Sequence, residues 1–127
     1  MISPAAAAWV FVGLTAVVAL FQLALAMGAP WGAYAMGGKF PGRFPPPMRI
    51  AALVQVALLA AFAGVVLARA GVALPDWRAG WLAWIVVGLM ALGVMLNLIT
   101  RSPRERMIWA PVAILLFLAS LRVALAN

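Results

Sequence analysis

The stretch Gly28–Arg49, GAPWGAYAMGGKFPGRFPPPMR, joins the first of four long apolar runs to the second and decides how the chain is divided. It holds five of the eleven glycines and five of the nine prolines, together with four aromatic residues. The aromatic residues distinguish it from a solvated linker, which is polar and poor in such side chains. Glycine permits positive φ angles and proline fixes φ, so together they specify a defined backbone shape. We therefore expect a compact, ordered loop that lies against an apolar surface.

The composition identifies that surface as a lipid bilayer. Of 127 residues, 69% are hydrophobic and 9% are charged, whereas about 25% of a soluble domain is charged. This length allows one domain with about four spans of ~20 residues. The nine basic residues lie at the ends of apolar runs, as in topology-setting loops, and not along one nucleic-acid-binding face. Cysteine and histidine are absent, which excludes disulfides and the commonest metal ligand and general base.

The sequence therefore predicts an all-α fold, a four-helix transmembrane bundle in one domain, with no cofactor and no enzymatic activity. Ser3-Pro4 is a favoured helix start, Gly28 and Gly71 are typical helix-ending glycines, and Pro111 should bend the last helix. Ala24–Ala26 resembles a signal-peptide cleavage site, but the run is long and no basic residue precedes it, which favours a retained span. The predicted spans are 5–27, 48–70, 77–100 and 103–126, with the ordered loop at 28–47.

The two acidic residues are both interpreted as groups at helix starts. Asp76 is the expected N-cap of the third span. Ser102 and Glu105 have the spacing of a capping box before the fourth span, and a carboxylate there also suits the helix dipole. This interpretation leaves no carboxylate for catalysis.

The basic residues predict the orientation of the spans. The first and third loops carry six, and the opposite side carries three. Because positively charged loops stay in the cytoplasm, we expect both termini outside a bacterial inner membrane. The six are Lys39, Arg43, Arg49, Arg101, Arg104 and Arg106, and the three are Arg69, Arg78 and Arg122.

A weak internal repeat relates the first and third spans. Trp9, Gly13 and Gln22 have counterparts in Trp84, Gly88 and Asn97, each 75 residues further on. The pattern fits a duplicated helical hairpin, and chance similarity between two apolar spans explains it equally well.

Three groups of residues are candidate sites. In the loop, Trp31, Lys39, Arg43 and Arg49 are expected to contact anionic lipid. Within the spans, the amides Gln22, Gln55 and Asn97 lie at a similar depth, which allows them to meet in an intramembrane polar cluster, and an amide there needs a hydrogen-bond partner. Helix-to-helix packing is the expected role of these amides, and a solute site is the alternative. Arg122 is expected to extend to the outer interface, whereas an inward pose would make it a functional candidate.

Two blocks of sequence resemble a family of small bacterial four-span membrane proteins. Its members pair a G-A-P-x-G…G-G-x-x-P-G-x-x-P…R loop with an N-x-x-(T)-x-S-x-x-E-R…W-x-P segment. This chain has Ala33 where some relatives have an acidic residue, so a carboxylate role there does not transfer. The resemblance implies the fold and not an activity. The matching residues are Gly28, Ala29, Pro30, Gly32, Gly37, Gly38, Pro41, Gly42, Pro45 and Arg49 in the loop, then Asn97, Ser102, Glu105, Arg106, Trp109 and Pro111.

The sequence favours a structural or accessory role, in which the protein packs against partner membrane proteins, copies of itself, or lipid. The alternative is a small homo-oligomeric transporter or channel for a solute or an ion, since four short helices enclose little volume. Such a protein would need Gln22, Gln55 and Asn97 to face a cavity.

Overall fold

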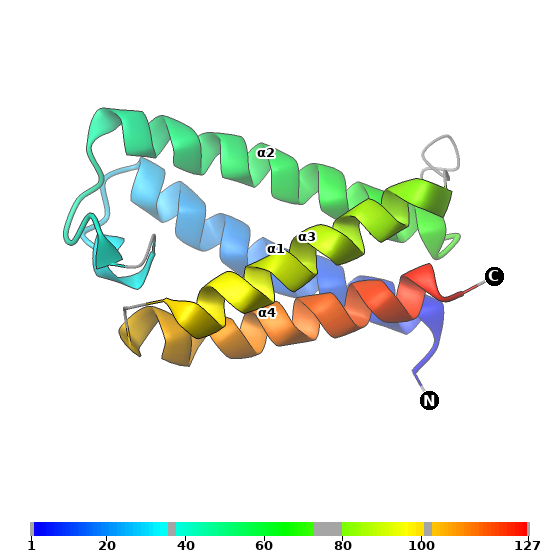
Figure 1. Ribbon diagram of the computed structural model, residues 1–127. Helices are drawn as coiled ribbons and strands as arrows, with labels where there is room; N and C mark the ends of the chain where they lie inside the picture. The colour runs from blue at the N-terminus through cyan, green and yellow to red at the C-terminus, as the bar shows by residue number, and fades with distance from the viewer. Residues whose placement is uncertain (1, 36–37, 73–79, 101–102, 127) are drawn as a thin grey trace.

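The computed structural model describes residues 2–35, 38–72, 80–100 and 103–126, and its helices form one bundle (Figure 1). Within these ranges there is no strand, which confirms the predicted all-α fold. The elements are α1 (Pro4–Ala26), a short 3-10 helix η1 (Gly32–Tyr34), α2 (Pro46–Arg69), α3 (Gly80–Ile99) and α4 (Pro103–Ala124).

The ends of the first two helices follow local sequence signals. The Ser3 hydroxyl accepts a hydrogen bond from the Ala6 amide at 3.1 Å, and Pro4 occupies the first turn, as predicted. Gly28 and Gly71 end α1 and α2 with φ angles of 97° and 75°, which side chains disfavour. α2 begins at Pro46, two residues before the predicted start, because prolines in a first turn lack only an N–H that the helix does not need.

The later boundaries are described in part. α3 is seen from Gly80, so Asp76 and the predicted start at Trp77 lie outside the described residues. α4 runs through Pro111 as one helix and ends at Ala124, two residues before the predicted end.

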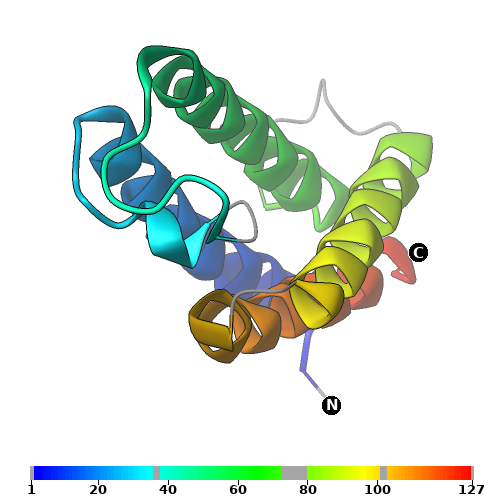
Figure 2. The same ribbon diagram turned by 60° about the vertical axis from the view of Figure 1, so that its left-hand side comes forward.

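The four helices pack unevenly. α1 packs along α2 and α4, and α3 packs mainly along α4, whereas α2 and α3 have few contacts. Two views show α2 and α3 diverging from the end where α2 finishes and α3 begins (Figures 1 and 2). All four helices contribute to the main core, which consists of Ala7, Ala8, Phe11, Val66, Val86, Leu116, Ala119 and Val123.

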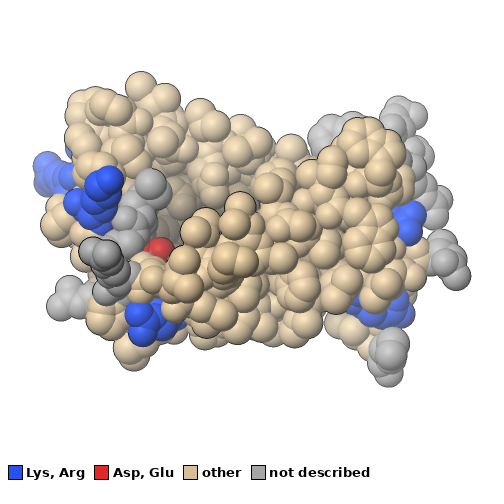
Figure 3. Space-filling view, viewed as in Figure 1, with Lys and Arg blue, Asp and Glu red and all other residues tan. Residues whose placement is uncertain are grey.

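Each of the four long helices is apolar and long enough to cross a membrane. Their 20 to 24 residues correspond to roughly 30–36 Å at about 1.5 Å per residue, close to the hydrocarbon thickness. Most of each span faces outward, since between 17% and 33% of it is buried inside the bundle. On the face shown in Figure 3, the Lys and Arg residues gather at the two ends of the molecule, and the surface between the ends is uncharged. These features are those of a small multi-pass membrane protein.

Candidate functional site

At the end of the bundle that carries residues 27–45, here the loop end, a backbone hydrogen bond connects two distant parts of the loop. The Gly32 amide donates to the Gly42 carbonyl oxygen at 2.8 Å, which joins the two sides of the loop. A Cβ atom on Gly32 would overlap the Phe40 carbonyl oxygen and lie 2.7 Å from that of Gly42. Position 32 therefore requires glycine, and the connection depends on it.

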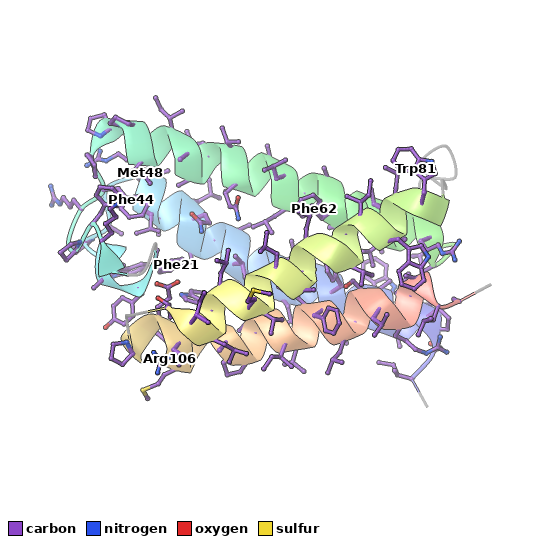
Figure 4. The ribbon with its side chains drawn as sticks, viewed as in Figure 1. Phe21, Phe44, Met48, Phe62, Trp81 and Arg106 are labelled. Atoms are coloured by element: carbon purple, nitrogen blue, oxygen red, sulfur yellow. The ribbon has the colours of Figure 1, made fainter. Side chains whose placement is uncertain are left out.

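Aromatic side chains attach this loop to the helices. Phe44 is 3% exposed and packs with Leu25, Ala35 and Ala52, and Figure 4 shows it beside Met48 at the loop end. On the other side of the loop, Trp109 of α4 donates from Nε1 to the Tyr34 carbonyl oxygen at 3.0 Å. The loop is thus tied to α1, α2 and α4.

Three aromatic rings, one of them from the loop, lie next to one another at the loop end. Phe21 of α1 lies parallel to Trp31, with ring centroids 6.4 Å apart, and contacts Trp109 at 4.7 Å in a tilted arrangement. Trp31 remains 47% exposed. A half-exposed indole at the end of a span has the placement typical of a membrane interface.

The three loop cations have different surroundings. Arg49 is half-buried, donates from Nε to the Phe44 carbonyl oxygen at 2.9 Å and lies against Gly28. Lys39 and Arg43 are exposed, and no ion pair or side-chain hydrogen bond engages either of them among the described residues. Of the cations predicted to contact lipid, Arg49 is therefore engaged by the loop itself, and Lys39 and Arg43 remain accessible.

Polar side chains next to the junction between α3 and α4 form a set of hydrogen bonds at the loop end. Arg106 donates to the Thr100 carbonyl oxygen at 2.6 Å, and the Thr100 hydroxyl donates to a Glu105 carboxylate oxygen at 3.3 Å. Glu105 lies in the first turn of α4, as predicted. Ser102, the other half of the expected capping box, lies outside the described residues, so reciprocal capping stays a prediction.

The three span amides have separate environments. Asn97 donates from its side chain to the Gly93 carbonyl oxygen of its own helix at 2.7 Å. Gln22 is half-buried and shares the helical register of the buried Phe11 and Thr15. Gln55 is exposed on α2. No hydrogen bond joins any two of the three within the part of the chain that the structure describes.

At the opposite end, here the terminal end, arginines hold the chain termini. Arg69 of α2 donates to the carbonyl oxygens of Ala124 and Ala126, at 2.8 and 2.9 Å, and so caps the C-terminal end of α4. Arg122 donates from Nε to the Ile2 carbonyl oxygen at 2.9 Å. A cation at a helix C-terminus also interacts favourably with the helix dipole.

A groove of about 220 Å³ lies between α1 and α4 at this terminal end. Its α1 side is formed by Ala7 and Val10, and Ile2 lies at its end. Its α4 side is formed by Leu115, Leu118, Ala119 and Arg122. All of the lining side chains except Arg122 are apolar.

No protein-family model, curated protein or solved structure matches the chain. Across the described ranges, no group of three His, Cys, Asp or Glu side chains is placed to hold a metal ion.

Sequence reasoning missed two features of this arrangement. The capping role of Arg69 joins residues 55 and 57 positions apart, which no local pattern encodes. The lateral groove depends on how α1 and α4 cross, so apolar residues in their sequences do not identify it. The role of Trp109 could have been inferred from the sequence, because an indole N–H near the end of a span is expected to find a hydrogen-bond acceptor.

Proposed function

We propose that the protein is a structural subunit of a membrane assembly, in which its outward helix faces pack against copies of itself or partner membrane proteins. The observation that carries this proposal is the surroundings of the helix glycines. A Cβ atom added at Gly13, Gly88 or Gly93 would meet nothing within 4 Å. Packing inside this chain therefore does not account for them. Small residues on membrane helices allow the close approach of another helix.

The outward stripe of α3 supports this role. Six exposed residues follow one another at alternating spacings of four and three, with Gly88 near the centre. Alternating spacings of four and three are typical of the residues at the contact between two helices in a left-handed coiled coil. Its members are Trp81, Ile85, Gly88, Leu92, Met95 and Ile99.

Gln55 adds an independent argument. Its amide is exposed on a membrane span, and an amide facing hydrocarbon without a partner is unfavourable. A neighbouring subunit would supply the missing hydrogen bonds.

The test compares Gly88→Leu with Ala60→Leu, a matched small-to-large change at an exposed position of α2. Loss of about 1–2 kcal/mol of helix contact lowers an association constant by roughly 5- to 30-fold. We expect Gly88→Leu to lower the association constant by this factor, measured by light scattering over a range of concentrations and by cross-linking in membranes, while Ala60→Leu leaves it unchanged. The proposal is wrong if the wild-type chain is monomeric and isolated in membranes, or if Gly88→Leu assembles normally.

A homo-oligomeric transporter or channel is the second candidate. Figure 3 shows the surface hollowed at the loop end, with part of an acidic residue, coloured red, inside the hollow. Gln22 lies on the inward-facing stripe of α1 near this end. Solute or ion flux in proteoliposomes that Gln22→Leu abolishes, with assembly intact, would favour this function over the structural one.

A further inference from the structure

We propose that the groove between α1 and α4 holds one anionic phospholipid, with its phosphate on Arg122 and an acyl chain along the apolar walls. The groove belongs to a single chain, so this binding site is independent of the assembly proposed through Gly88.

The shape and chemistry of the groove are amphipathic. Its walls are apolar, and Val10, Leu115 and Leu118 are each between 43% and 52% exposed. The surface beside a membrane span is covered by acyl chains, so an apolar groove there is an acyl-chain site by its surroundings.

Arg122 places one positive charge at the end of these walls. It lies in the last turn of α4, next to Ile2, which precedes α1. Its Nε is engaged by the Ile2 carbonyl oxygen, which fixes the guanidinium group. In the described part of the chain no carboxylate pairs with it. The terminal guanidinium nitrogens are thus available as donors, and a guanidinium group binds a phosphate through paired hydrogen bonds.

The positive charge of Arg122 favours a phospholipid over a helix from a second copy as the occupant of the groove. A helix from a second copy would place apolar side chains over the walls and leave Arg122 without a counter-charge. A phospholipid satisfies both parts of the site, since its phosphate meets the cation at the membrane boundary and its chain fills the groove.

Native mass spectrometry of the purified full-length chain in mild detergent, with added phosphatidylglycerol, tests the site. We expect one lipid retained per chain. Arg122→Gln should lower retention about fivefold, the factor that corresponds to the ~1 kcal/mol of one cation near an anionic lipid. Arg122→Lys, which keeps the charge, should retain lipid within about twofold of the wild type. Arg43→Gln, at the opposite end, should have no effect on this adduct.

A second pair of variants tests the walls. Val10→Phe fills the groove from an exposed position, whereas Val17→Phe makes the same change on α1 outside it. We expect Val10→Phe to abolish the one-lipid adduct and Val17→Phe to preserve it, with equal helicity by circular dichroism.

Three results would overturn the proposal. Equal lipid retention by Val10→Phe and the wild type would exclude the groove. Oleate retained as well as phosphatidylglycerol, without dependence on Arg122, would make it a fatty-acid site. A change of oligomer mass in Val10→Phe, without loss of lipid, would show that a second copy covers it.

Discussion

The two ends of the bundle both carry arginines, but they use them differently. At the terminal end, Arg69 and Arg122 each donate to carbonyl oxygens of the chain termini. At the loop end, Arg49 and Arg106 also donate to backbone carbonyl oxygens, while Lys39 and Arg43 are exposed and make no ion pair or side-chain hydrogen bond with any described residue. Some of the basic residues counted in the sequence therefore stabilise the fold through hydrogen bonds to backbone carbonyl oxygens, and a charge count alone does not identify them. The exposed Lys39 and Arg43 lie at the loop end, where most of the basic residues of the sequence also lie.

The largest effect expected from the difference between the two ends is on the orientation of the protein in its membrane. We propose that the loop end lies in the cytoplasm, because the exposed Lys39 and Arg43 strengthen a positive-inside bias. Reporter fusions after Ala126 and within the loop at Lys39 should give opposite, all-or-none signals, with the C-terminal fusion active outside. A C-terminal reporter active in the cytoplasm would contradict the proposed orientation.

The second prediction compares an engaged arginine with a free one. Arg69→Met removes two charged hydrogen bonds to the end of α4 and should lower the free energy of unfolding by about 2–3 kcal/mol. Arg43→Met removes an exposed, unpaired charge and should change it by less than about 0.5 kcal/mol. Titration with a denaturing detergent in mixed micelles measures both. Equal losses for the two variants would show that the ends do not differ in this way.

The third prediction compares two tryptophans. Trp109→Phe keeps the ring contact with Phe21 and loses the hydrogen bond to Tyr34, so it should cost about 1 kcal/mol. Trp81 is 65% exposed at the other end, and in the described part no hydrogen bond holds it. Figure 4 shows it directed away from the bundle. Trp81→Phe should therefore be close to neutral in the same titration, and a loss as large as that of Trp109→Phe would be unexpected.

The fold was predictable because its signals are local. Ser3 with Pro4 starts α1, and glycines with positive φ end α1 and α2, each through contacts within a few residues. Apolar runs of this length need no partner to be identified as spans.

The site was predictable only in part because its contacts depend on side-chain directions and on how the helices pack. Loop composition indicated a compact loop, but not that Arg49 would donate to the Phe44 carbonyl oxygen while Arg43 stays exposed. Similar depth suggested that Gln22, Gln55 and Asn97 could meet. Depth, however, does not fix the direction in which a side chain leaves its helix, and Gln55 faces outward.

The hydrogen bonds at the terminal end also constrain the order in which the chain can fold during synthesis. The first two helices and the loop between them can pack as soon as both have been made, because they bury Leu25, Phe44 and Ala52 together. α3 has its main partner in α4, so it must wait for the last segment of the chain. The bonds from Arg69 to Ala126 and from Arg122 to Ile2, 57 and 120 residues apart, can form only after α4 has been made. A chain that stops before α4 would therefore hold a packed pair of first helices and a third helix without its main partner.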